Sequence, residues 1–107
     1  MRRGELYRVY RPAGDPKKYR TFVIVSRQTT IASSFSTVIC APVFTDAIGL
    51  STQVPIGVDE GLKHDSWVMC DNLVSAFKRD LTQYVGAMSP AKLAELDGAL
   101  KIALGLD

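Results

Sequence analysis

Short apolar segments, each followed by a proline, a glycine or small polar residues, fill most of this 107-residue chain. Segments of this length that are rich in β-branched and aromatic residues favour strands over helices. We expect strands over residues 4–10, 19–26, 37–44, 52–56, 66–70 and 83–87. Loops or turns are expected between them, at residues 11–18, 27–36, 45–51 and 74–80. The segment 27–36 has room for one helical turn.

Two prolines lie inside the expected strands. The segment 37–44 is apolar on both faces, so we expect it at the centre of the sheet. Pro42 lies within this segment and cannot donate a ladder hydrogen bond, which predicts a bulge or the end of the strand. Pro55 marks 52–56 as an edge strand or an irregular one for the same reason.

The C-terminal segment has the pattern of a helix. Ser89 suits the N-cap, Pro90 suits the first helical position, and Gly105 suits the residue after the helix. Leucines recur between them at helical spacing: Leu93, Leu96, Leu100 and Leu104. This stripe should face the sheet or a second subunit. The order of elements predicts a single domain over residues 1–107, mainly β with a C-terminal α-helix, built as a compact barrel or a curved sheet.

Composition indicates an ordinary globular chain, with 47% hydrophobic and 22% charged residues and enough length for one hydrophobic core. No apolar run approaches the roughly 18–20 residues that span a bilayer. The N-terminal residues also lack the apolar stretch of a signal peptide. We therefore expect a cytoplasmic protein with no membrane partner, in which Cys40 and Cys70 stay reduced and buried.

Positive charge is concentrated near the N-terminus. Residues 1–30 contain eight of the thirteen basic residues and two of the eleven acidic ones, a net charge of +6, whereas the rest of the chain carries −4. We call these eight residues the basic block: Arg2, Arg3, Arg8, Arg11, Lys17, Lys18, Arg20 and Arg27. Such a block attracts polyanions, because each neutralised phosphate releases counterions. A solvated basic face without a partner explains the composition equally well.

Several kinds of catalytic site are excluded by what the sequence lacks. It contains one histidine, His64, and no CxxC, HExxH, P-loop, GxGxxG or GxSxG motif. An enzyme built from this chain would therefore work without a metal or another cofactor. Its charge would be stabilised by arginine or lysine, and its protons would be handled by hydroxyls, water or a carboxylate. His64 lies in an expected loop, where a histidine is more often an exposed bystander than a functional group.

The aromatic residues allow two interpretations. Tyr7, Tyr10 and Tyr19 lie near the basic block and could stack on nucleobases, although core packing is the commoner role. Trp67 and Tyr84 are expected in the core or at a dimer interface.

The order of the segments resembles the MazF/PemK (Kid) family of toxins from bacterial toxin–antitoxin pairs. The matching segments are Arg3–Tyr7, Arg20–Ser26, Thr37–Thr45, Asp71–Ala76, Lys78–Leu81, Val85–Ser89 and Ala99–Leu106. The resemblance implies the CcdB/PemK-like plasmid maintenance toxin fold, an SH3-like small β-barrel. It also implies a homodimer and a cognate antitoxin partner.

The same resemblance implies an activity. The chain would be a sequence-specific, metal-independent and ribosome-independent endoribonuclease that cleaves single-stranded RNA, leaving 2′,3′-cyclic phosphate and 5′-hydroxyl ends. Arg20 matches the family's catalytic arginine, and Thr45 matches the hydroxyl residue that ends the third strand. RNA-binding roles fall to Lys17, Lys18, Tyr19, Arg27 and Asn72.

Two positions depart from the family pattern. Thr21 stands where the family usually has proline, and the segment Pro42–Thr45 is one residue longer than its counterpart. Thr45 reaches the site only if a bulge absorbs this residue; otherwise Phe44 takes its place and the site has no hydroxyl. Two other functions therefore stay open. One is a CcdB-like gyrase-binding poison, although this chain lacks that toxin's Trp-Gly-Ile ending, and the other is a catalytically inactive SH3-like binding module.

Overall fold

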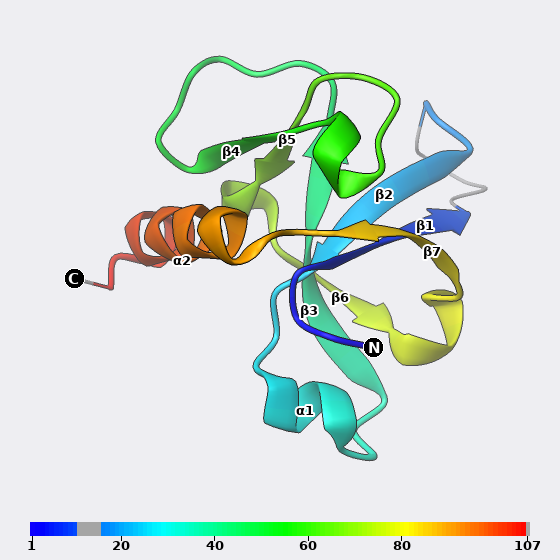
Figure 1. Ribbon diagram of the computed structural model, residues 1–107. Coiled ribbons are helices and arrows are strands. Elements are labelled where there is room, and N and C mark those ends of the chain that lie inside the picture. Colours follow the sequence, from blue (N-terminus) through cyan, green and yellow to red (C-terminus); the bar gives the residue numbers. More distant parts are fainter. Residues whose placement is uncertain (11–15, 107) are drawn as a thin grey trace.

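One antiparallel sheet forms the body of the computed structural model, which describes residues 1–10 and 16–106 (Figure 1). Its seven strands, all within the described residues, are β1 (Glu5–Tyr10), β2 (Tyr19–Ile24), β3 (Thr37–Phe44), β4 (Gln53–Ile56), β5 (Ser66–Met69), β6 (Val74–Phe77) and β7 (Gln83–Ala87). The same described residues form two α-helices, α1 (Gln28–Ala32) and α2 (Pro90–Leu104), and three 3₁₀ turns, η1 (Val58–Glu60), η2 (Cys70–Asn72) and η3 (Lys78–Asp80). The prediction of a mainly β domain with a C-terminal helix is confirmed.

The strand order is β4-β5-β3-β2-β1-β7, and β6 also pairs with β3. The strand β3 is therefore central, as its apolar sequence predicted. Its first half pairs with β6, its residues 40–42 pair with β2, and its last two residues pair with β5. One long strand that changes partners along its length bends the sheet into a half-barrel (Figure 1).

Pro42 occupies the point where β3 changes partners. The β2–β3 ladder runs from Cys40 to Pro42 without a register shift, and the strand continues to Phe44 against β5. The expectation of a bulge or a strand end at Pro42 was therefore wrong. A residue without an N–H donor is tolerated here because the ladder to β2 has reached its last pair. Pro55 lies in β4 at the end of the strand order, which confirms the predicted edge strand.

The segment 74–80 was expected to be a turn, but its first half is strand β6. The prediction failed because 3₁₀ turns precede and follow this four-residue strand, and their residues made the whole segment resemble a turn. Pairing with β3 from Thr37 to Cys40, more than thirty residues earlier in the chain, stabilises it. The predicted helical turn within 27–36 is α1, which buries Ile31. Residues 11–15 of the expected loop at 11–18 lie outside the described residues.

The helix α2 begins and ends where its local signals predicted. Ser89 Oγ accepts a hydrogen bond from the backbone N–H of Lys92 at 3.2 Å, and Gly105 adopts a left-handed conformation with φ +69°. Leu96 is fully buried, whereas Leu104 is exposed. The leucine stripe therefore packs on the sheet in the middle of α2 and is exposed to solvent in the last turn of the helix. No helix among the described residues is long and apolar enough to cross a membrane.

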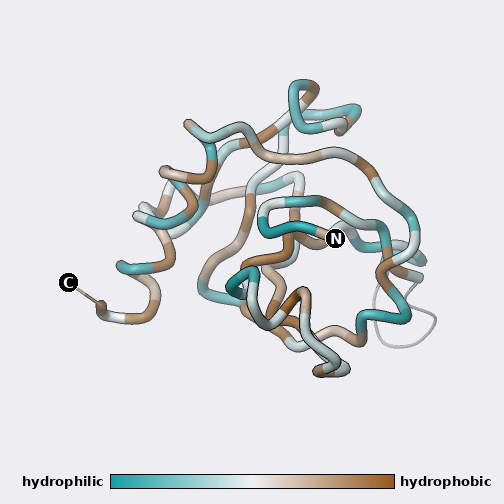
Figure 2. The backbone as a smooth tube through the Cα atoms, turned by 60° about the horizontal axis from the view of Figure 1, so that its bottom comes forward, coloured by the Kyte–Doolittle hydropathy of each residue, from teal (hydrophilic) through white to brown (hydrophobic). Residues whose placement is uncertain are grey.

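In the part of the chain that the structure describes, buried side chains form two clusters rather than the single core that was expected. Alternation along β2 sends Val23 into the cluster under α2, and Phe22 and Ile24 into the cluster beside α1. Figure 2 shows hydrophobic and hydrophilic residues interspersed along the backbone. Cys40 and Cys70 are free and buried, one in each cluster. Burial raises the pKa of the Cys40 thiol to about 12 and that of Cys70 to about 11.

Candidate active site

Arg20 is a buried cation held against the end of β3. The strand β2 presents its side chain with only 9% of the residue exposed. Its Nη1 donates a hydrogen bond of 3.5 Å to the backbone oxygen of Val43. Its Cζ lies 4.2 Å from the centroid of the Phe44 ring, within the range of a cation–π interaction. A guanidinium stays charged even when buried, so this contact orients a permanent positive charge.

A pocket of about 150 Å³ opens beside this guanidinium. Its lining comes from the start of β2, the end of β3 and the segment before β5: Lys17, Tyr19, Arg20, Thr21, Val43, Thr45, Leu62, Lys63, His64 and Ser66. The two residues predicted to be catalytic, Arg20 and Thr45, thus share one pocket. Thr45 lines it although β3 pairs with β2 and β5 without a register shift, so the expectation that Thr45 needs a bulge to reach the site was wrong. Thr45 is exposed in a bend directly after β3. Phe44 is not among the described residues that line the pocket. Its ring packs instead on the guanidinium of Arg20.

The five residues predicted to bind RNA are distributed over the molecule. Lys17 and Tyr19 line the pocket, and Lys18 is exposed between them in sequence. Arg27 instead lies at the start of α1, where its Nε donates a hydrogen bond of 3.1 Å to Thr29 Oγ1. Asn72 is exposed on η2, the turn that packs against α2. Within one chain, the fold does not bring Arg27 and Asn72 to the pocket.

Lys63 and His64 line the pocket although the sequence did not single them out for it. They precede β5, which pairs antiparallel with the end of β3 through Trp67 and Phe44. Antiparallel pairing places the residues just before Trp67 beside those just after Phe44. The segment carrying Lys63 and His64 therefore lies next to Thr45. Only the pairing of β3 with β5 could have revealed this.

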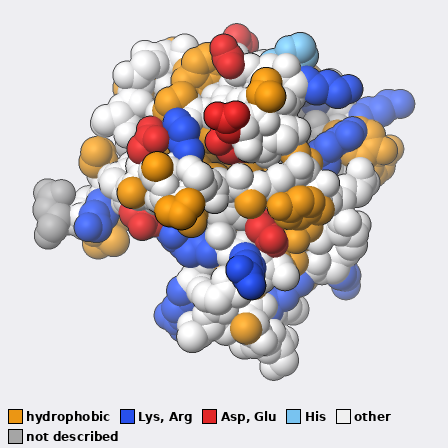
Figure 3. Space-filling model, viewed as in Figure 1, with side chains coloured by type: hydrophobic (Ala, Val, Ile, Leu, Met, Phe, Trp, Pro, Cys, Tyr) orange, Lys and Arg blue, Asp and Glu red, His pale blue; other side chains and the backbone are white. Residues whose placement is uncertain are grey.

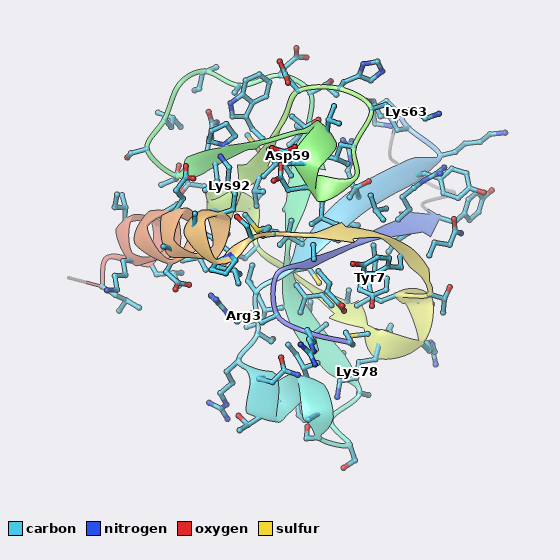
Figure 4. All side chains as sticks on the ribbon, viewed as in Figure 1. Arg3, Tyr7, Asp59, Lys63, Lys78 and Lys92 are labelled. Carbon is cyan, nitrogen blue, oxygen red and sulfur yellow. The ribbon has the colours of Figure 1, made fainter. Side chains whose placement is uncertain are left out.

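A second hollow of about 610 Å³ continues the pocket toward β1 and β7. The two hollows share Lys17, Tyr19, Thr21, Leu62, Lys63 and His64, so we treat them as one groove. The second hollow adds Arg8, Gly61, Tyr84 and Val85 to the lining. Figure 3 shows the histidine and neighbouring basic side chains together on this side of the molecule. Lys63 lies near the start of β2, whereas Lys78 lies beside α1 at the other end (Figure 4).

Aromatic rings alternate with cations along this groove. The Cζ of Arg8 lies 4.7 Å from the centroid of the Tyr19 ring, and the rings of Tyr10 and Tyr19 meet edge to face at 5.4 Å. Tyr84 is 58% exposed, and its ring meets Tyr7 edge to face at 5.7 Å. Tyr7 itself belongs to the core, as the commoner interpretation had it. Burial and a hydrogen bond to Glu5 raise the pKa of Tyr7 to about 12.

The groove is positively charged. Arg8, Lys17, Arg20 and Lys63 line it, and no Asp or Glu among the described residues does so. A concave surface lined by cations alone concentrates anions. Within the described residues there is also no group of three or more His, Cys, Asp or Glu side chains that could hold a metal ion.

Comparison with known proteins gives consistent matches over nearly the whole chain. Residues 2–104 match the family described as the PemK-like, MazF-like toxin of type II toxin–antitoxin systems. Endoribonuclease MazF3 of Mycobacterium tuberculosis is 31% identical over 90 residues, which cover 84% of this chain and 86% of the relative.

Solved structures agree with this match. The Mycobacterium tuberculosis toxin MazF-mt6 has a TM-score of 0.83 at 27% identity, covering 96% of this chain and 98% of that one. A mycobacterial endoribonuclease in complex with its cognate antitoxin has a TM-score of 0.86 at 27% identity, covering 100% of this chain and 97% of that one.

Proposed function

Because this chain belongs to the PemK-like, MazF-like family of type II toxin–antitoxin toxins, we propose that it is an endoribonuclease that cleaves single-stranded RNA. The observation that carries the proposal is the shared pocket of Arg20 and Thr45, in a groove lined by cations without a carboxylate among the described residues. Such a groove suits a substrate with a continuous phosphate backbone. Exposed Tyr84 and Tyr19 offer rings on which unpaired bases can stack.

In the proposed reaction, the scissile phosphate lies in the pocket and Arg20 stabilises its non-bridging oxygens. The ribose 2′-oxygen attacks phosphorus, and negative charge grows on those oxygens as the phosphorane forms. A fixed guanidinium directed at that charge lowers the barrier, because its orientation is already set by Val43 and Phe44. The hydroxyl of Thr45 accepts the proton of the 2′-hydroxyl and passes its own proton to solvent. The products are a 2′,3′-cyclic phosphate and a 5′-hydroxyl.

This mechanism uses no metal, no ribosome and no cofactor, so the purified chain alone should cut. The test is incubation of the protein with total RNA and then with synthetic single strands, in excess EDTA. Cleavage at a short recurring sequence, with cyclic phosphate at the 3′ ends, is expected. Loss of cutting in EDTA that magnesium or manganese restores would contradict the mechanism. The assay also separates this function from a gyrase-binding poison or an inactive module, neither of which cuts RNA.

Arg20→Ala is the decisive variant. Removing one positioned charge-stabilising donor typically lowers kcat by about 10²–10³-fold. A folded Arg20→Ala protein with undiminished turnover would remove the central element of the proposal. Circular dichroism and thermal unfolding of the same sample show whether the variant is folded.

The proposed partners are a second copy of this chain and a cognate antitoxin. Exposed apolar residues favour a two-fold homodimer, among them Ile39 and Val74 on the paired strands β3 and β6. Sedimentation equilibrium at micromolar concentration tests the dimer against a monomer of 11.7 kDa. The antitoxin is proposed to lay an acidic segment across the cationic groove and compete with RNA. An RNA-cleaving toxin acts where its substrate is, so we also keep the prediction of a cytoplasmic location.

A further inference from the structure

The cleavage reaction needs a proton donor that neither Arg20 nor Thr45 supplies. When the bond between phosphorus and the 5′-oxygen breaks, the departing ribose oxygen becomes an alkoxide unless it receives a proton. A guanidinium does not give up its proton under physiological conditions. In the proposed reaction, the hydroxyl of Thr45 already accepts a proton from the 2′-hydroxyl. A third group, either another side chain or a water molecule, must therefore protonate the leaving oxygen.

His64 is the one histidine of the chain, and it lines both hollows of the groove. It shares the smaller hollow with Arg20 and Thr45, so a phosphate held there lies within one pocket of all three groups. Histidine is the side chain that ordinarily changes its charge in the neutral pH range. It is therefore suited to give a proton during one turnover and to recover it before the next.

The segment that carries His64 is anchored on both sides. Gly61 packs so closely on β7 that a Cβ atom there would collide with the backbone oxygen of Val85. On the other side, Ser66 Oγ donates a hydrogen bond of 3.0 Å to the backbone oxygen of His64. These contacts hold the backbone of the segment that carries His64, whose exposed side chain lines the pocket.

We propose that His64 is the general acid of the cleavage reaction, an inference that rests on the proposed function. The bond between the 2′-oxygen and phosphorus forms as the bond between phosphorus and the 5′-oxygen breaks. The imidazolium of His64 gives its proton to the 5′-oxygen, which leaves as a 5′-hydroxyl. The neutral imidazole then takes a proton from solvent, so protons and electrons balance over one turnover.

The groove around His64 carries several charged and titratable groups. Lys17, Arg20 and Lys63 line the same pocket, and Arg8 lines the adjoining hollow. Tyr19 and Tyr84 are the other titratable groups among the described residues that line the groove. Asp65 follows in sequence, and its Oδ1 lies 3.3 Å from the position that a Cβ atom would take at Gly57. The charged residues among the described lining of the groove are all cations, which oppose an imidazolium, and a bound phosphodiester brings negative charge that offsets them.

A leaving group that needs no proton tests the proposal. The substrate is an oligonucleotide carrying the sequence that the wild-type protein cuts, made with oxygen or with sulfur as the 5′-bridging atom. A thiolate departs without protonation, so His64→Ala should lose about 10²–10⁴-fold in kcat on the oxygen substrate and almost nothing on the sulfur substrate. His64→Gln should behave in the same way. The ratio of the wild-type rates on the two substrates should vary with pH, and this variation should disappear in His64→Ala.

Lys63→Ala is the matched control from the same segment. A residue that only attracts the phosphate should affect both substrates equally. Equal losses of His64→Ala on the two substrates, or full activity on the oxygen substrate, would overturn the assignment of His64. Wild-type cleavage of the oxygen substrate establishes the proposed function independently, so a failure of the acid and a failure of the nuclease give different results.

Discussion

Phe44 should act as a positioning residue for Arg20. In this chain the ring of Phe44 lies under the guanidinium with 4.2 Å between Cζ and the ring centroid. A cation–π contact that is partly desolvated contributes about 0.5–2 kcal/mol. Replacing the ring by an aliphatic side chain in Phe44→Leu removes this interaction while keeping most of the apolar volume. If the whole loss appears in the transition state, kcat should fall by about 2- to 30-fold, since ~1.4 kcal/mol corresponds to tenfold.

The measurement is single-turnover cleavage of a defined RNA by four proteins: wild type, Phe44→Leu, Arg20→Ala and the double variant. If the ring acts through the guanidinium, Phe44→Leu should have almost no further effect once Arg20 is absent. Phe44→Tyr retains a ring and should stay near wild-type activity. Equal losses from Phe44→Leu in the presence and absence of Arg20 would refute the coupling. Thermal unfolding of each variant separates a loss of activity from a loss of folded protein.

Three further predictions concern the hydroxyl, the groove and the cysteines. Thr45→Ser should keep most of the activity and Thr45→Ala should lose about tenfold or more in kcat, because only the first retains a hydroxyl; equal activities would remove Thr45 from the reaction. Lys17→Glu and Lys63→Glu should weaken binding to every RNA sequence. The plot of log affinity against log salt should also become less steep, by about 0.7 in slope for each phosphate of a single strand that is no longer neutralised. An unchanged slope in filter binding would show that these lysines do not neutralise phosphates. The folded-state pKa values of Cys40 and Cys70 are raised by burial to about 12 and about 11, whereas unfolded thiols ionise near about 8.5. Their contribution to the free energy of unfolding is complete below about pH 8.5 and is lost as pH rises toward 11–12. The urea concentration at the unfolding midpoint should therefore fall between about pH 8 and 10. The fall should be smaller in Cys40→Ala, which lacks one of the two buried thiols.

Local signals predicted those parts of the fold that local interactions determine. The helix α2 follows from Ser89, Pro90 and Gly105, each of which acts within one helical turn. The strand β6 could not be predicted in this way, because its pairing with β3 spans more than thirty residues of sequence. The edge position of β4 was predictable because Pro55 limits pairing wherever it occurs.

The candidate site shows the same division. Arg20 and Thr45 could be named from the resemblance to a family, since the order of their segments is a property of the sequence. Arg27 was grouped with Arg20 because the two are close in sequence. A strand rises about 3.3 Å per residue, so seven residues carry the chain to the opposite end of β2. His64 was passed over because its place beside Thr45 depends on the pairing of β3 with β5.

The packing of Gly61 on β7 should affect both the stability of the protein and its activity. Gly61 has φ +93°, and a Cβ atom there would collide with the backbone of Val85 on β7. Gly61→Ala should therefore lower the free energy of unfolding by about 1–2 kcal/mol, because alanine is strained in the left-handed conformation. Displacement of the segment away from β7 should lower it further. A domain of this size loses about 4–8 °C in Tm for each kcal/mol, so a fall of roughly 10 °C or more is expected.

Gly49 offers a matched control for the Gly61 substitution. It has φ +79° and no atom near the position of an added Cβ, so Gly49→Ala carries the conformational cost without the collision. The difference in Tm between the two variants measures the packing of the segment 61–64 on β7. If this packing also positions His64, Gly61→Ala should lower kcat on RNA with a 5′-bridging oxygen more than on RNA with a 5′-bridging sulfur, when both are measured well below Tm. Equal Tm values for the two variants would show that the segment is not held by β7, and the positioning of His64 would then need another source.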